Sequence, residues 1–186
     1  MEQLRESINA LRRKNYQGRY FVPEDALFRL LQRDKIREAL KGKTQHYELE
    51  ELVEIIFSGA RKIFAILVLN HYEQYITRFV EHDQLQSTQS PLDHKLPFEL
   101  EPLQILMTPG HAQLFDEKQW EFTAPVFTPS VLRRSLKFDT ILPFIKEKEV
   151  GTGGFGTVYT IEIEPSHQIF DPSIKVSCYL SKLIFF

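Results

Sequence analysis

The hydrophobic periodicity of this chain changes near Phe138, and this change constrains the possible folds more than any other feature. In residues 1–80, apolar side chains recur at the spacing of amphipathic helices. In "GTVYTIEIEP", residues 156–165, apolar and polar side chains alternate, which is the period of a β-strand. We therefore predict an α+β chain with a mainly helical N-terminal region followed by a short antiparallel β-region.

The helical region carries recognisable helix boundaries. Pro23 fits the first turn of a helix, the acidic pair after it suits the positive N-terminus, and Gly42 fits the C-terminal cap. The pair Ser58–Gly59 is expected to break or link two helices. Residues 60–80 are apolar around much of the helix circumference, so we predict that they form the buried centre of a small bundle.

The chain divides into three predicted regions: a helical region at 1–80, a connecting segment at 81–137 and a β-region at 138–186. Prolines recur in the connecting segment too often for one long regular element. We predict that it is irregular, with short helices near "ELEPLQILM" and "SVLRRSL", and that "KQWEFTAPVF" could hold a short strand. The sequence leaves open whether residues 96–140 pack with the helices or with the β-region.

Charge and composition exclude several classes of protein. The net charge of −2 gives no global field that would direct the chain to nucleic acid. The longest apolar run in the helical region, "IFAILVL" at 63–69, is far shorter than the about 20 residues that span a bilayer, and the charged start lacks a secretory signal. The single cysteine, Cys178, excludes an intrachain disulfide and a cysteine-built metal site. We expect a cytoplasmic or nuclear protein without membrane contact.

The two halves of the helical region differ in charge. Residues 1–43 are rich in Lys and Arg, whereas residues 44–90 are rich in Asp and Glu. The basic helices could pack against the acidic ones, or "RRK" at residues 12–14 could contact an acidic partner. A solvated helix face is the simplest interpretation of so short a cluster, since short charged runs usually face water.

The segment "GTGGFG", residues 151–156, joins the two alternating segments and holds four of the eight glycines. Gly151, Gly153 and Gly156 match G-x-G-x-x-G, and Val158 extends the match. A dinucleotide fold would place a helix after these glycines, whereas here a predicted strand follows. A glycine turn between two strands is the arrangement that covers the ATP phosphates in protein kinases, and a glycine-rich hairpin without a ligand is the alternative.

The stretch "LPFIKEKEVGTGGFGTVYTIEIEPSHQIF" resembles the opening of a protein-kinase catalytic domain. It is most similar to a fungal group of serine/threonine-type kinase-like proteins, within the protein kinase superfamily, that carry a helical region before the kinase domain. The kinase resemblance covers residues 141–186 and implies that the loop binds ATP, with Phe155 closing over the phosphates and Val158 against the base. The nucleotide-binding residues that it implies are Val150, Gly151, Thr152, Gly153, Gly154, Phe155, Gly156, Thr157, Val158 and Lys182.

Lys182 is the preferred candidate for the strand-three lysine that holds the α- and β-phosphates of ATP in kinases. It lies in "YLSK" on a predicted third strand, "IKVSCYLSKLIFF", and Lys175 in "PSIK" is the second candidate. Kinases usually have an alanine two residues before this lysine, which makes room for adenine, whereas Leu180 and Ser173 stand there in this chain. A lysine on a strand face without a ligand is the remaining interpretation of both.

The motifs that complete a kinase are absent from the sequence. It contains no H-R-D-x-x-x-x-N, D-F-G or A-P-E motif and no segment for the αC glutamate, so we assign no catalytic residue and no Mg²⁺ ligand. The resemblance implies transfer of the γ-phosphate of ATP to Ser or Thr, with Mg²⁺, in a full-length kinase, and we expect this chain to be truncated and inactive. The alternative function is a helical protein-interaction or regulatory module with a vestigial kinase-like β-tail.

The histidines do not indicate a metal site. None of the six has the H-x-x-x-H or H-E-x-x-H spacing that is typical of zinc ligands. His167, in "SHQIFDPS", is interpreted as an exposed loop residue.

Overall fold

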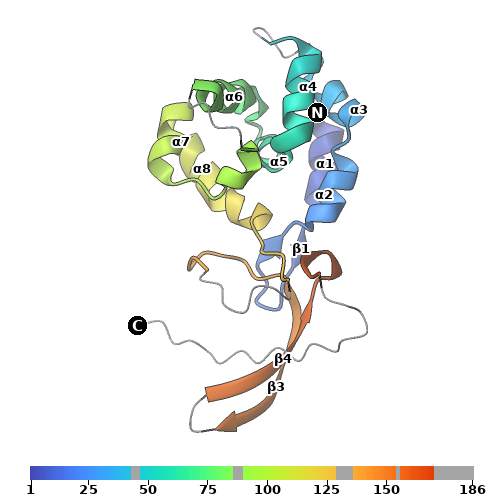
Figure 1. The fold of residues 1–186 in the computed structure, drawn as a ribbon, viewed down its shortest axis with the longest axis vertical. Coiled ribbons are helices and arrows are strands. Elements are labelled where there is room, and N and C mark those ends of the chain that lie inside the picture. The colour runs from blue at the N-terminus through green and yellow to red at the C-terminus, as the bar shows by residue number, and fades with distance from the viewer. Residues whose placement is uncertain (43–46, 86–89, 129–135, 154–155, 170–186) are drawn as a thin grey trace.

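The structure is a computed structural model that describes residues 1–42, 47–85, 90–128, 136–153 and 156–169. Within these ranges it has two main parts, a body of α-helices and a long β-hairpin that projects from one end of that body (Figure 1). The α+β fold class with a mainly helical N-terminal region is therefore confirmed. No helix in these ranges is long and apolar enough to cross a membrane.

We call the α-helices together the helical body and strands β3 and β4 the hairpin. The helices are α1 Glu2–Leu11, α2 Glu24–Leu30, α3 Arg33–Leu40, α4 Leu49–Gly59, α5 Arg61–Leu69, α6 Ile76–Leu85, α7 Leu100–Leu106 and α8 Pro109–Gln119. The short 3₁₀ turns are η1 Glu73–Tyr75, η2 Leu92–Lys95, η3 Trp120–Phe122 and η4 Pro165–His167. The strands form two antiparallel pairs, β1 Arg13–Lys14 with β2 Tyr20–Phe21 and β3 Phe144–Gly153 with β4 Gly156–Ile163.

The centre of the helical body is α5. Its residues from Ile63 to Val68 are completely buried, and it contacts α1, α2, α4, α6 and α8. The predicted buried centre at residues 60–80 is thereby confirmed for the part that α5 covers, which is apolar on every side because none of its faces reaches water. The range then turns at residues 70–72, where His71 is exposed, and continues in η1 and α6. The predicted break is also confirmed, because α4 ends at Gly59 and α5 begins at Arg61.

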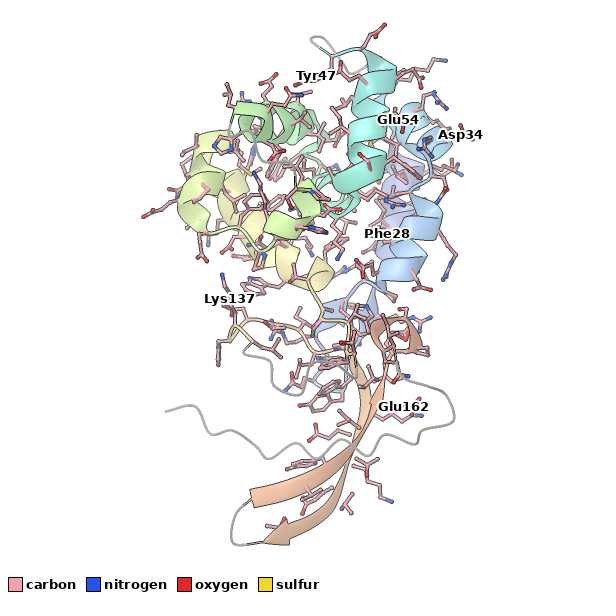
Figure 2. The ribbon with its side chains drawn as sticks, viewed as in Figure 1. Phe28, Asp34, Tyr47, Glu54, Lys137 and Glu162 are labelled. Atoms are coloured by element: carbon pink, nitrogen blue, oxygen red, sulfur yellow. The ribbon has the colours of Figure 1, made fainter. Side chains whose placement is uncertain are left out.

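Charge pairs connect α3 to α4. Arg33 Nε lies 2.5 Å from Oε1 of Glu54, and Arg37 Nε lies 2.6 Å from Oε1 of Glu50. Figure 2 labels Glu54 on α4 and Asp34 on the neighbouring α3. The basic α3 thus packs against the acidic α4, which was one of the interpretations that the sequence left open. Because these side chains remain largely exposed, the pairs orient the two helices more than they stabilise them.

The leucine-rich segment after Pro23 forms two helices rather than one. The backbone of Leu31 leaves the helical region, with φ −86° and ψ 66°, so α2 ends there and α3 begins at Arg33. Leu31 is completely buried, and tertiary packing therefore fixes a corner that no glycine or proline marks. Gly42 has a φ of +76°, as expected for a glycine that follows a helix.

The segment between residues 92 and 122 packs with the helices. Leu103 of α7 and Phe115 of α8 belong to the same buried core as α5. The helix predicted near "ELEPLQILM" is confirmed by α7, whereas the one predicted near "SVLRRSL" lies almost entirely outside the described residues. The sequence left the packing of residues 96–140 open, and the helical core takes the first part of that range.

The short strand suggested for "KQWEFTAPVF" is wrong. Helix α8 continues to Gln119 and then tightens into η3, where Trp120 keeps helical backbone angles of φ −62° and ψ −26°. Phe122 is buried in the helical core. The other two aromatic residues of this segment face the hairpin: Trp120 packs against Phe21, Ala124 and Ile141, and Phe127 packs on Phe144.

Candidate functional site

The glycine-rich segment lies at the closed end of the hairpin. The last three cross-strand pairs of β3 and β4 are Gly151–Val158, Thr152–Thr157 and Gly153–Gly156. The predicted pair of antiparallel strands is thereby confirmed, and Gly151, Gly153 and Gly156 lie within the ends of these strands. Four of the predicted or alternative site residues lie outside the described residues: Gly154, Phe155, Lys175 and Lys182.

Gly151 lacks the two usual structural reasons for a glycine. Its φ is not in the left-handed region, and a Cβ atom added to it would meet no atom within 4 Å. Its neighbour Val150 lies at a register irregularity between Glu149 and Gly151 and is 66% exposed. Such irregularities redirect side chains. This side of the hairpin is therefore open to a ligand that approaches the backbone.

Polar side chains gather near the closed end. Thr152 Oγ1 donates to Oε1 of Glu149 at 2.8 Å and lies 3.2 Å from Oγ1 of Thr157. The Glu149 carboxylate puts a negative charge beside the glycine segment. Lys146 does not offset this charge, because its Nζ is paired with Oε2 of Glu162 at 2.6 Å. Backbone N–H groups of this part of the hairpin can serve as phosphate donors.

A polar hollow of about 260 Å³ lies where the starts of α2 and α5 meet residues 123–126. Glu24 and Lys62 line it as an ion pair, with Oε1 and Nζ 2.7 Å apart. Asp93 also lines it, and its carboxylate accepts the backbone N–H groups of Lys62 at 2.9 Å and Ile63 at 3.0 Å. Asp93, carried by η2, therefore caps the N-terminus of α5.

Burial raises the pKa of Asp93 to about 6, although the two backbone N–H groups and the charge of Lys62 oppose part of the rise. A carboxyl group that titrates in this range can gain or lose a proton close to neutral pH. The sequence did not point to Asp93, because the helix that it caps lies about 30 residues earlier in the chain. A capping residue is readable from sequence only when it directly precedes its helix.

His167 is buried, and its interpretation as an exposed loop residue is wrong. It is 1% exposed, its Nδ1–H donates to the carbonyl oxygen of Pro125 at 3.2 Å, and its ring meets that of Phe21 edge-on. The N–H of Phe127 also donates to the His167 carbonyl at 2.8 Å and so holds η4 against this segment. Burial lowers the pKa of His167, which keeps the ring neutral at pH 7.

An apolar hollow of about 370 Å³ lies between α6, η2 and α7. Phe79 and Phe98, whose ring centroids are 5.6 Å apart, line it together with Leu92. Lys95 and Asp83 form an ion pair in the same lining. The hollow can enclose an apolar group of a small molecule or of another protein.

The described residues contain no group of three or more His, Cys, Asp or Glu side chains that could hold a metal ion. No known protein family, curated protein or solved structure matches this chain. The candidate sites are therefore defined by their own geometry. They are the closed end of the hairpin, the polar hollow and the apolar hollow.

Proposed function

We propose that this chain binds ATP through the glycine-rich end of the hairpin. The proposal rests on Gly151, because neither its backbone angles nor its neighbouring atoms require a glycine at this position. Glycine at this position lets the backbone approach phosphate oxygens without an intervening side chain. Gly153 and Gly156 form the last cross-strand pair, and we propose that they too let the backbone approach the phosphates.

The proposed roles follow the positions along the hairpin. The backbone N–H groups of residues 151–156 hold the phosphates, Phe155 closes over them, and Val158 on the return strand lies against the base. Lys182 is the proposed partner of the α- and β-phosphates. The remaining positions of the proposed site are Val150, Thr152, Gly154 and Thr157.

The proposed lineage is that of kinases that transfer the γ-phosphate of ATP to Ser or Thr. That reaction needs Mg²⁺ ligands and a residue that positions the attacking hydroxyl, and the sequence contains no kinase motif that supplies them. We therefore expect nucleotide binding without phosphoryl transfer from this chain. The cytoplasm or nucleus, where ATP is abundant, is the proposed location.

A titration with ATP, followed by the amide shifts of residues 151–158 in two-dimensional NMR spectra, tests the proposal. We expect a dissociation constant in the millimolar range, which corresponds to about −4 kcal/mol, because the hairpin is only part of a nucleotide site. Gly153→Asp should abolish the shifts, since it places a carboxylate against the phosphates. Gly110→Asp adds the same charge in α8, where a Cβ meets no atom within 4 Å, and should leave binding unchanged. Equal shifts in both variants would overturn the proposal.

The second candidate function is a helical protein-interaction module, and the apolar hollow favours it. Lys95 and Asp83 neutralise each other there, so the apolar lining is the feature that a partner would recognise. A photo-crosslinking residue at Glu99, in the same lining, should capture a discrete protein, whereas one at the exposed Glu6 of α1 should not.

Pro102→Arg separates the two candidate functions. Pro102 lines the apolar hollow, and the longer charged side chain should abolish capture at Glu99 while ATP binding is retained. Gly153→Asp should have the opposite effects. Capture that persists in Pro102→Arg would exclude the hollow as the interaction site.

A further inference from the structure

The hairpin meets the helical body at a joint that is assembled from distant segments of the chain. Phe21, Ala124 and Ile141 form its buried apolar cluster, and Trp120 and Ile145 pack against them. This cluster is much smaller than the core of the helical body. Apolar burial therefore fixes the joint less firmly than it fixes the body, and charged groups acquire more influence over its geometry.

Arg13 contacts the hairpin side of the joint. Its Nη1 donates to Oε1 of Glu164, the residue that follows β4, at 3.0 Å. The side chain of Glu164 is 6% exposed, whereas that of Arg13 is 57% exposed. The backbone N–H of Glu164 also donates to the carbonyl of Pro143, the residue before β3, at 2.9 Å. The Glu164 carboxylate is therefore fixed relative to the roots of both strands.

Arg12 contacts the helical side of the joint. Its Nε lies 2.7 Å from Oε2 of Glu121, and its Nη2 lies 2.9 Å from Oε1 of the same carboxylate, which η3 carries. Lys118 of α8 also reaches Oε1 of Glu121, at 2.9 Å, from within the helical body. The backbone at Arg12 is extended, and β1 begins at the next residue. Successive side chains of an extended chain point to opposite sides. Two adjacent arginines therefore reach the two different parts of the molecule.

Neutral hydrogen bonds place this segment beside the start of β3. Asn15 is 4% exposed, and its Nδ2 donates to the carbonyl of Leu142 at 3.1 Å. The N–H of Tyr16 donates to the carbonyl of Phe144 at 2.8 Å. These two bonds fix the register between the residues that directly follow the arginines and the hairpin root.

We propose that Arg12 and Arg13 form a two-sided electrostatic clamp that sets the direction in which the hairpin leaves the helical body. The second oxygen of Glu164, Oε2, is buried without a hydrogen-bond partner among the described residues, so Arg13 is needed to offset a buried charge. Without Arg13, hydration of the carboxylate would draw the end of β4 toward water. The two arginines of "RRK" are thus paired within the chain with Glu121 and Glu164, and the clamp is independent of nucleotide binding.

Distances between spin labels, measured by pulsed electron paramagnetic resonance on the full chain, test the clamp. The labels are attached at Ile105→Cys on α7 and Lys148→Cys on β3, which are both exposed, in a Cys178→Ser background. Arg13→Ala and Arg12→Ala should each broaden the distance distribution about twofold, because the joint then samples more than one direction. Lys146→Ala, which removes the exposed pair with Glu162 inside the hairpin, should leave the distribution unchanged.

Conservative variants distinguish a charge clamp from a general loss of packing. Arg13→Lys keeps the charge and should restore a narrow distribution. If circular dichroism shows that Arg13→Ala does not fold, Glu164→Ala removes the same pair from the other side and replaces it in the test. If the folded variant gives a distance distribution as narrow as that of the unmodified chain, the clamp is overturned. Equal broadening in Lys146→Ala also overturns it.

Discussion

The helical body and the hairpin are stabilised in different ways. Every helix from α1 to α8 contributes side chains to one apolar core, whose centre is the fully buried α5. In the hairpin, backbone pairing holds the strands, and the side chains from Ile145 to Thr152 are exposed or only partly buried. A two-stranded sheet alone is marginally stable at best, so the hairpin depends on the joint. The proposed chemistry thus lies in the part that contributes least to the stability of the fold.

Truncation of one isoleucine in each part should give the largest difference between them. Ile66 is completely buried in α5, whereas Ile161 in β4 is only partly buried. We expect Ile66→Ala to lower the free energy of unfolding by about 2–5 kcal/mol because it leaves a cavity, and Ile161→Ala by less than about 1 kcal/mol. Urea unfolding followed by circular dichroism measures both values. Similar losses in the two variants would contradict the contrast between body and hairpin.

The pH dependence of stability should come in part from Asp93 in the body. Its pKa is raised from 3.8 to about 6, so the folded state binds the proton more tightly than the unfolded state does. The resulting stabilisation is complete below about pH 3.8 and is lost as the pH rises through 6. Relative to Asp93→Asn, the unmodified chain should lose about 2–3 kcal/mol of unfolding free energy between pH 4 and pH 7. A pH-independent difference between the two proteins would refute this assignment.

Alanine substitution at one glycine of each part tests how tightly that part is packed. A Cβ at Gly59 would lie 2.9 Å from Cβ of Pro91, whereas a Cβ at Gly151 would meet no atom within 4 Å. We expect Gly59→Ala to cost about 1–3 kcal/mol through overpacking. Gly151→Ala should change stability by less than about 0.5 kcal/mol. Thermal unfolding measures both, and a large loss in Gly151→Ala would mean that this glycine serves the fold rather than a ligand.

The smallest expected effect concerns the charge beside the glycine segment. Glu149→Gln removes a carboxylate near the proposed phosphate position while the side chain can still accept the hydrogen bond from Thr152. We expect ATP affinity to rise about threefold, as removal of one screened repulsion would predict. Glu117→Gln, which removes a carboxylate of α8, provides the control. Equal affinities of the two variants would place the phosphates away from Glu149.

Sequence patterns predicted the features that depend on residues close to one another in the chain. The periodicity change separated the helices from the hairpin, and the apolar run identified the buried α5. The hairpin could be predicted because alternation and glycine spacing are local properties of the chain. The corner at Leu31, the cap that Asp93 provides and the burial of His167 could not, because each depends on a segment far away in sequence.

The sequence by itself determined which segments become helices or strands and where the glycines lie, since these follow from side-chain period and backbone freedom. Only the tertiary structure decided that adjacent arginines, Arg12 and Arg13, serve two different parts of the molecule. An arginine in the sequence is equally compatible with water, an acidic partner or a carboxylate of the same chain. Folding decided between these possibilities, because it buried Glu121 and Glu164 beside one extended segment. Arg12, together with Lys118, offsets the charge of Glu121, and Arg13 offsets that of Glu164.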